Sequence, residues 1–340
     1  MPLLVPLSFF YRALAAVHRW SYRLGIRHSQ RLPRPVISIG NLAIGGGGKT
    51  PMVMLVAEWA RRTGLDAAIL SRGYGRKSRR IRITGSGDGF QQVGDEPVLM
   101  ARKLVGVPVA VSSDRSKAGR ALLERHKVDL FILDDAFSHH ALHKDLEIVV
   151  IDDTRRLGNG WTLPAGFLRE PPRRLRDAHL IVVTKANRVD TAFEEEIGRL
   201  TPAPVVWAQF RPSHLVPVGS PPGEVVTPPE GPFLAFCGIA NPESFKDSLD
   251  RLGLDVAVFQ DFPDHHPYSR RDVERINETA RRAGAVALVT TEKDAVRWPG
   301  SQASLPCFAL VMHLIILEGE QVIKERLDGV MTKSRDGWPT

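Results

Sequence analysis

The stretch RPVISIGNLAIGGGGKTPMVMLVAEWARRTG, residues 34–64, decides the fold expected for this chain. An apolar run at its start predicts a buried strand, and apolar side chains at helical spacing near its end predict a helix that stops at Gly64. These side chains are Met52, Leu55, Val56 and Trp59. A glycine-rich loop lies between the two elements. Strand, glycine loop and helix in this order indicate a site for nucleotide phosphates.

The loop itself departs from the usual phosphate-binding pattern G-x-x-x-x-G-K-[ST], because Ala43 stands where the first glycine belongs. Four consecutive glycines nevertheless allow a tight turn whose N–H groups converge on phosphate oxygens. Lys49 would balance charge on the transferring phosphate, and the Thr50 hydroxyl would join the shell of a magnesium ion. A glycine-rich turn with a chance Lys-Thr pair is the alternative. The predicted nucleotide-binding residues are Ala43, Ile44, Gly45, Gly46, Gly47, Gly48, Lys49 and Thr50.

Two carboxylates follow a second apolar run, VDLFILDD, residues 128–135. A phosphate-binding loop needs an acidic group at the end of a neighbouring strand, where it holds magnesium through water. Asp134 and Asp135 stand in that position. Adjacent acidic residues are otherwise often a helix cap or an exposed turn. Beside the glycine loop, we interpret them as part of a magnesium site.

Bulk composition sets broad limits on function. The chain has 340 residues, of which 43% are hydrophobic and 25% charged, which is typical of a soluble protein with two moderate domains. Its two cysteines, Cys237 and Cys307, match no metal-binding spacing and are expected as buried thiols in a reducing compartment. The net charge of +8 favours an anionic partner, without choosing between nucleic acid, a phosphorylated molecule and a membrane.

Residues 1–34 form a basic arm, since no Asp or Glu precedes Glu58. Helical spacing would place the apolar residues on one face and the arginines on another. The apolar face comprises Leu7, Phe10, Leu14, Val17 and Leu24, and the basic face Arg12, Arg19, Arg23 and Arg27. The apolar run is too short to span a bilayer, so we expect this helix to lie on an anionic membrane surface. A helix packed on its own domain with solvated arginines is the alternative.

Apolar strands and helical stretches alternate along the rest of the chain, which predicts an α/β fold with a mostly parallel sheet flanked by helices. We expect a nucleotide-binding domain of the P-loop type at 35–210. A Pro- and Gly-rich linker or hairpin should follow at 211–231, and a smaller α/β domain at 232–330 should close over the site. Residues 331–340 are expected to form a tail.

Several motifs together resemble the tetraacyldisaccharide 4'-kinases of lipid A biosynthesis, and the resemblance covers nearly the whole chain. They are GNLAIGGGGKTP, LSRGYGRK, GDEPVLMA, DDAFSHHALHKDLEIVVID, GNGWTLPAGFLREP, FCGIANPESF, FPDHHPYS and TEKDAVR. The family also lacks the first glycine of the loop, which accounts for Ala43. It commonly reads Asp-Asp-Gly-Phe-Gln-His where this chain has Ala136 and Ser138, so position 138 carries a hydroxyl in place of the family's side-chain amide.

The resemblance implies transfer of the γ-phosphate of ATP, with Mg²⁺, to the 4'-hydroxyl of a tetraacylated glucosamine disaccharide 1-phosphate. The product would be the 1,4'-bisphosphorylated lipid A precursor, lipid IVA. The reaction would take place at the cytoplasmic face of the bacterial inner membrane, on which the protein would be peripheral. The basic arm fits an acceptor that stays in the bilayer. We expect neither a nucleic acid nor an obligate protein partner.

The resemblance also assigns site residues. Asp95 would be the base that takes the hydroxyl proton, His265 would position it across an interdomain cleft, and Glu96 would contact magnesium. Read without the resemblance, GDEP is equally a turn followed by a helix. Substrate contacts would come from Asn41, Arg72, His139 and Arg169, of which the two arginines can grip phosphate bidentately. Lys185, in TKANRVD, is interpreted as a solvent contact at a strand end.

Two other functions remain open at this point. A membrane-associated switch ATPase of the partition type pairs a similar loop with an amphipathic helix, but it carries a Lys where this chain has Ile44. Nucleic-acid binding by the basic arm would need stacking aromatics or a known module, which the sequence does not offer. We therefore favour the lipid kinase.

Overall fold

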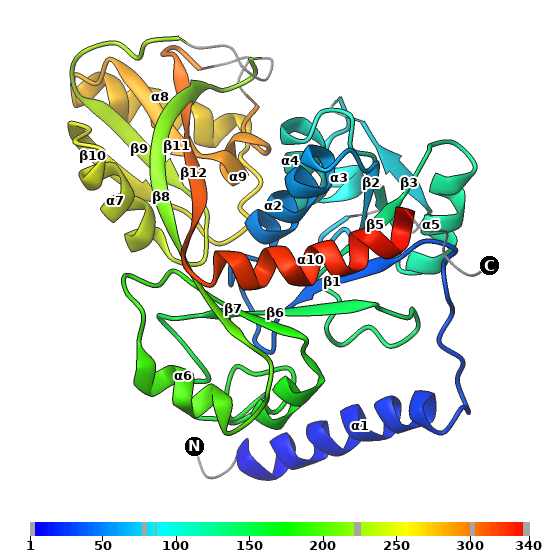
Figure 1. The fold of residues 1–340 in the computed structure, drawn as a ribbon. Coiled ribbons are helices and arrows are strands. Elements are labelled where there is room, and N and C mark those ends of the chain that lie inside the picture. Colours follow the sequence, from blue (N-terminus) through cyan, green and yellow to red (C-terminus); the bar gives the residue numbers. More distant parts are fainter. Residues whose placement is uncertain (1–3, 77–79, 86, 221–225, 300–302, 336–340) are drawn as a thin grey trace.

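The computed structural model describes residues 4–76, 80–85, 87–220, 226–299 and 303–335. Its strands form one mixed sheet in the order β10-β9-β11-β12-β8-β7-β6-β1-β5-β2-β4-β3 (Figure 1). All neighbouring pairs are parallel except β8 with β12 and β3 with β4. The strands are β1 (Val36–Gly40), β2 (Ala67–Ser71), β3 (Arg82–Thr84), β4 (Val109–Val111), β5 (Leu130–Asp134), β6 (Leu146–Asp152), β7 (Leu180–Thr184), β8 (Val205–Pro217), β9 (Phe233–Cys237), β10 (Val256–Asp261), β11 (Ala287–Thr291) and β12 (Cys307–Glu318).

Helices cover both faces of the sheet, so the expected α/β fold with a mostly parallel sheet is confirmed. Every residue of β1, β2, β5 and β7 is buried, which explains why these strands read as continuous apolar runs. The helices are α1 (Val5–Arg23), α2 (Lys49–Arg62), α3 (Phe90–Val93), α4 (Asp95–Lys103), α5 (Arg115–Leu123), the 3₁₀ helix η2 (Pro172–Asp177), α6 (Thr191–Gly198), α7 (Pro242–Arg251), α8 (Arg270–Arg282), α9 (Glu292–Ala295) and α10 (Glu320–Arg335).

Strands β8 and β12 form a long antiparallel ribbon at the middle of the sheet order. Their pairing runs from Phe308 opposite Pro217 to Glu318 opposite Trp207. We call β1 to β7, with the helices that precede β8 and with α10, the first part. We call β9 to β12, with α7, α8 and α9, the second part. The expected linker at 211–231 begins as strand, because β8 continues to Pro217. Residues 221–225 of that linker lie outside the described residues.

Helix α10 follows the second part in sequence but crosses back over the first part (Figure 1). Its side chains Ile323, Leu327 and Val330 lie in the same apolar cluster as Met52 and Val56 of α2. The apolar stripe of α10 is buried against the first part, so the last residues of the range expected for the smaller domain, 232–330, pack on the first part. The expected tail begins inside α10, and residues 336–340 lie outside the described residues.

Helix α1 lies apart from the sheet, at the lower edge of the molecule in Figure 1. Its buried residues are Ser8 and Arg19. The Ser8 hydroxyl donates to Thr162 O at 2.9 Å, and Arg19 pairs with Glu170 at 3.3 Å. Arg19 is thus a docking residue rather than a member of an exposed basic face, because its partner is a buried carboxylate.

The apolar face predicted for α1 points away from the protein. Its members are 54–69% exposed: Leu7, Phe10, Leu14, Val17 and Leu24. Phe9 and Trp20, on the same helix, are also more than half exposed. The helix does pack on its own domain, through Ser8, Arg19 and an edge contact between Phe9 and Trp161, but the apolar face predicted from spacing is not the face that packs. None of the helices in the described ranges is long and apolar enough to cross a membrane.

Candidate active site

The glycine loop connects β1, in the middle of the first part, to the N-terminus of α2. Gly48 precedes α2 with φ +86°, a left-handed conformation that favours glycine. A Cβ at Gly48 would lie 2.9 Å from Cζ of Phe210 on β8, so a larger residue has no room there. The Thr184 hydroxyl donates to Gly47 O at 2.7 Å. These contacts hold the loop below the helix end, where backbone N–H groups can face an anion.

Lys185 contacts this loop, so its interpretation as a solvent contact is wrong. Its Nζ donates to Gly46 O at 3.2 Å and to Asp152 Oδ2 at 2.6 Å. The contact arises because β7, which Lys185 follows, lies beside β6, and β6 ends at Asp152. The sequence did contain a signal for this contact. A strand that ends in Asp and a next strand that is followed by Lys bring the two charges together if the strands are parallel neighbours.

Asp134 and Asp135 lie at the end of β5, which pairs with β1. Arg169 binds Asp135 through both carboxylate oxygens, at 3.0 and 2.6 Å, and Lys49 lies 3.6 Å from Asp135 Oδ1. Burial raises the pKa of Asp135, but hydrogen bonds from Arg169 and the charge of Lys49 outweigh it and lower this pKa to about 2. Asp135 is therefore ionised and already paired.

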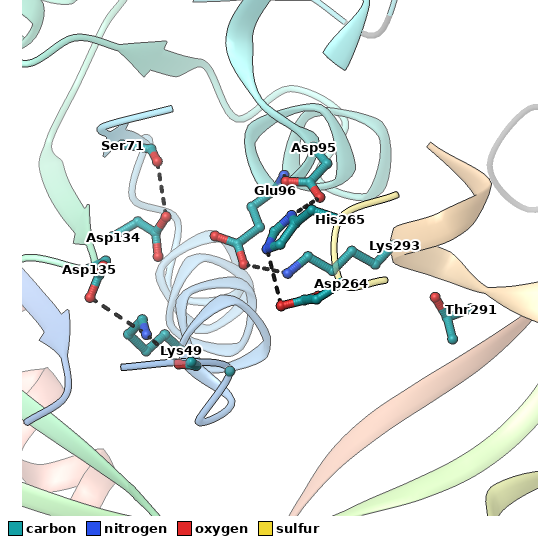
Figure 2. Close-up of polar contacts among 12 residues, drawn as sticks. Lys49, Ser71, Asp95, Glu96, Asp134, Asp135, Asp264, His265, Thr291 and Lys293 are labelled. Atoms are coloured by element: carbon teal, nitrogen blue, oxygen red, sulfur yellow. Dashed lines mark hydrogen bonds and ion pairs between the residues drawn. The ribbon is translucent and has the colours of Figure 1, made fainter. Parts of the chain in front are cut away.

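Asp134 has the opposite environment. Its side chain is 2% exposed, and it accepts one hydrogen bond from the Ser71 hydroxyl at 3.0 Å. Its Oδ1 atom has no hydrogen-bond partner among the described residues. Burial, followed by the charges of Glu96 and Asp135, raises its pKa to about 7. Figure 2 shows the Asp134 and Glu96 carboxylates on facing sides of the site. A buried carboxylate oxygen without a partner, among further negative groups, is suited to a cation.

The residues at this position fit a magnesium ion. Mg²⁺ prefers oxygen ligands and keeps several waters, so it needs few protein groups. Thr50, buried in the first turn of α2, and Asp134 supply such oxygens. No group of three or more His, Cys, Asp or Glu side chains in the described ranges could hold a metal without help from other ligands. A magnesium ion here would therefore depend on phosphate oxygens and water.

We expect Asp134→Asn to raise the melting temperature of the metal-free, nucleotide-free protein at pH 8 and to change it little at pH 4. The pKa of Asp134 is raised from 3.8 to about 7 in the folded protein. The free energy of unfolding therefore falls as the pH rises through this window and the buried carboxylate ionises. The uncharged amide of Asn does not ionise, so this loss is absent in the variant. Each kcal/mol regained should raise the melting temperature by roughly 2 °C. Thermal unfolding in EDTA at both pH values measures it, with Asp250→Asn on α7 as the exposed control. A lower melting temperature of Asp134→Asn at pH 8 would contradict a destabilising buried charge at Asp134.

A second group of side chains joins the two parts of the molecule (Figure 2). His265, in the segment between β10 and α8, places Nδ1 2.8 Å from Oδ2 of Asp95, the first residue of α4. Asp95 is 6% exposed. Burial raises the pKa of Asp95, but the hydrogen bond with His265 and the charges of Lys293 and Arg297 give a net lowering. The structure thus brings together the two residues expected to form a base and its orienting partner.

Glu96 pairs with Lys293 of α9 at 3.0 Å, a contact between the two parts. Lys103 and Glu292 form a parallel contact at 2.7 Å between the same two helices, α4 and α9. Glu96, which the family resemblance places at magnesium, is thus paired with a lysine for which the sequence predicted no role. The motif TEKDAVR was the available signal, since it belongs to the family resemblance but received no role.

Of the four predicted substrate residues, Asn41 and Arg169 contact each other, whereas no hydrogen bond among the described residues joins His139 or Arg72 to that pair. Asn41 is buried and accepts a hydrogen bond from Arg169, beside the glycine loop. His139 lies 3.3 Å from the buried Arg115, and burial followed by the charge of Arg115 lowers its pKa to about 3, so the ring is neutral. Arg72 is exposed. Arg115, whose Nε has no partner among the described residues, received no role from the sequence.

The fold and site define a class: an α/β protein with a large, mostly parallel sheet flanked by helices and a phosphotransfer site at the end of its central strands. The sequence profile of the tetraacyldisaccharide-1-P 4'-kinases matches residues 1–332. The chain belongs to this family, and it is therefore an ATP-dependent kinase of lipid A biosynthesis.

Individual relatives agree with the profile. The tetraacyldisaccharide 4'-kinase of Syntrophus aciditrophicus is 39% identical over 325 residues, covering 90% of this chain and 87% of the relative. That of Anaeromyxobacter sp. (strain K) is 36% identical over 333 residues, covering 94% and 88%. The solved structure of LpxK from Aquifex aeolicus, an "apo" form in complex with ATP, has a TM-score of 0.77 at 32% identity and covers 96% of this chain and 98% of that one.

Proposed function

We propose that this chain transfers the γ-phosphate of ATP to the 4'-hydroxyl of a tetraacylated glucosamine disaccharide 1-phosphate and so forms lipid IVA. The observation that carries the proposal is the contact between Asp95 and His265, with 2.8 Å between Oδ2 and Nδ1. A sugar hydroxyl needs a base as it attacks phosphorus, and a buried, ionised carboxylate meets that need. The name of the family and of its relatives supports the choice of acceptor.

The glycine loop and Lys49 would hold the phosphates of ATP, in a P-loop type of fold. Thr50 and Asp134 would hold Mg²⁺, with Glu96 near enough to add a negative charge. When bound, the ion would neutralise charge on the β- and γ-phosphates. Asp135 is bound by Arg169, so we assign it to orienting the loop side chains rather than to direct contact with the metal. Asn41, Arg72, His139 and Arg169 are proposed as contacts for the acceptor.

Asp95 would act as the base in an in-line transfer. The acceptor oxygen forms a bond to the γ-phosphorus while the bond from that phosphorus to the bridging oxygen of ADP breaks. The hydroxyl proton passes to a carboxylate oxygen of Asp95. His265 holds the other side of that carboxylate, and since it comes from the second part, the pair is complete only when the two parts are together. We therefore propose residues 35–210 and 232–319 as two functional units that close over the site.

One assay tests this function directly. Purified protein, γ-labelled ATP and the acylated disaccharide 1-phosphate are combined in mixed micelles, and the lipid fraction is separated. We expect the label on the lipid at the 4' position. Release of labelled inorganic phosphate without labelled lipid would contradict the proposal and favour a switch ATPase.

We also propose that the protein is peripheral on the cytoplasmic face of the bacterial inner membrane. An acylated acceptor stays in the bilayer, so the enzyme must approach it from the surface. The outward apolar face of α1 and the net charge of +8 both favour an anionic membrane. Because Ser8 and Arg19 dock the helix to the first part, that apolar face stays free for lipid.

Replacing Phe10, Leu14 and Val17 together with serine should release the protein from anionic vesicles. Burial of a large apolar side chain contributes about 1.5 kcal/mol or more, so three losses should weaken binding by about 10²-fold or more. We expect the KM for lipid to rise and the KM for ATP to stay constant. Vesicle co-sedimentation and initial rates measure both. Val105→Ser, an exposed apolar residue 64% accessible outside α1, is the control. Unchanged co-sedimentation would remove the membrane assignment of α1.

A further inference from the structure

Arg297, which follows α9, is a buried charge whose donors are only partly used. Its side chain is 1% exposed. Its Nη2 atom donates to Gly238 O at 3.0 Å and to Asp294 Oδ1 at 2.5 Å. Its Nε and Nη1 atoms have no hydrogen-bond partner among the described residues. Burying a guanidinium with unused donors is costly, so an unpaired donor aimed at a site invites a functional explanation.

The unused donor Nη1 points toward the proposed base, since it lies 3.6 Å from Asp95 Oδ2. The other terminal nitrogen, Nη2, is linked to His265 through a shared backbone acceptor. Gly238 O, which accepts from Arg297, also accepts the N–H of His265 at 3.0 Å. One rigid guanidinium therefore contacts the Asp95 carboxylate on one side and the anchor of the His265 backbone on the other.

Arg297 is itself held firmly. Asp294, which is 0% exposed, accepts hydrogen bonds from the Gly238 N–H at 3.0 Å and the Tyr268 hydroxyl at 2.9 Å, in addition to Arg297. Its second oxygen accepts from the Thr291 hydroxyl at 2.6 Å. The guanidinium therefore belongs to a fixed polar network within the second part, and only its Nη1 atom extends across to the first part.

The contacts of Asp95 show what remains for a substrate. Oδ1 accepts the N–H of Glu96 at 2.9 Å, and Oδ2 faces both His265 and Arg297. A carboxylate offers about four acceptor positions, and hydrogen bonds occupy two of them here, so acceptor capacity is left for an incoming hydroxyl. The two hydrogen bonds orient the carboxylate, and the nearby charge of Arg297 favours the same orientation; His265 and Arg297 both come from the second part.

We propose that Arg297 is a positioning residue, which orients the Asp95 carboxylate and anchors the His265 backbone so that the two meet only when the second part is in place. This inference rests on the proposed role of Asp95 as base. A misplacement of about 1 Å in a reacting group costs on the order of 10²-fold in rate, which sets the effect expected for Arg297. Nucleotide binding should not depend on Arg297, because no contact joins it to the glycine loop among the described residues.

The test is a double-mutant cycle in the full-length protein, using Arg297→Met and Asp95→Asn with lipid phosphorylation as the readout. We expect Arg297→Met to lower kcat by about 10²-fold in the wild-type background and by less than about 3-fold in Asp95→Asn, because the base it positions is already absent there. The KM values for ATP and lipid should stay within about 2-fold. Arg282→Met, an arginine paired with Glu278 on the exposed side of α8, is the matched control.

A folding defect is separated from a positioning role by a second variant. Arg297→Lys keeps the charge but cannot reach Gly238, Asp294 and Asp95 at once, so we expect a partial loss of kcat with a melting temperature close to that of the wild type. If Arg297→Met does not fold, Arg297→Lys takes its place in the cycle. Equal losses in both backgrounds, or a folded Arg297→Met with wild-type kcat, would overturn the inference. A wild-type protein that labels no lipid would instead overturn the proposed function.

Discussion

Replacing Lys49 with alanine should lower kcat by about 10³-fold or more, in line with the loss of an electrostatic contact made at the transition state. Lys49 is the first residue of α2, and its Nζ lies 3.3 Å from Gly45 O and 3.6 Å from Asp135 Oδ1. Lys49 is the only Lys or Arg within loop residues 43–50, whereas Lys185 and Arg169 approach from other elements and are paired with Asp152 and Asp135. The fold should survive the change, because Asp135 keeps both hydrogen bonds from Arg169.

The measurement is the rate of lipid labelling under saturating ATP, together with thermal unfolding to show that the variant is folded. Lys127→Ala is the matched control, since this lysine pairs with Asp66 at 2.8 Å on the surface. We expect wild-type turnover from Lys127→Ala. Turnover close to wild type in Lys49→Ala would remove the assignment of the glycine loop to phosphate transfer.

Asp95→Ala should be the second most damaging change, with a loss of about 10²–10⁴-fold, the range expected for a general base. His265→Ala should cost less, because His265 orients the carboxylate but does not take the proton. The double variant should be little worse than Asp95→Ala alone, since the two residues act as one unit. ATP affinity should change little in all three variants.

His266→Ala is the control for the histidine, because this neighbour pairs with Asp272 at 3.1 Å and contributes to the packing of the second part. Steady-state rates give the cycle, and equilibrium binding of ATP gives the affinity. Losses that multiply would show that His265 acts independently of Asp95. Full activity in Asp95→Ala would leave Glu96 or Asp134 as the base.

The first part of the fold could be predicted from local pattern. The sequence of strand β1, the glycine loop and α2 indicated their order, and Asp134 ends a strand whose residues are all buried. The exposed apolar face of α1 was predicted from residue spacing alone. In each case the deciding interactions lie within about one element of the chain, where spacing determines which side chains share a face.

The remaining features depend on contacts between distant residues. Arg19 looked like part of a basic face, but it is buried because Glu170, 151 residues away, pairs with it. Lys185 looked exposed until β6 placed Asp152 beside it. Lys293 and Glu96 are 197 residues apart. Periodicity carries no information on such pairs, and the partnership of Asp95 and His265 came from family resemblance instead.

The β8–β12 ribbon has a kinetic consequence. A module on a single flexible tether must search for its partner, and its effective concentration falls as the tether lengthens. Here both crossings of the chain between the two parts are strands hydrogen-bonded to one another, from Phe308 opposite Pro217 to Glu318 opposite Trp207. In the closure that we propose, His265 would therefore return to Asp95 by bending of a paired ribbon rather than by the search of a single flexible tether. Exchange of second parts between two molecules would require that ribbon to come apart.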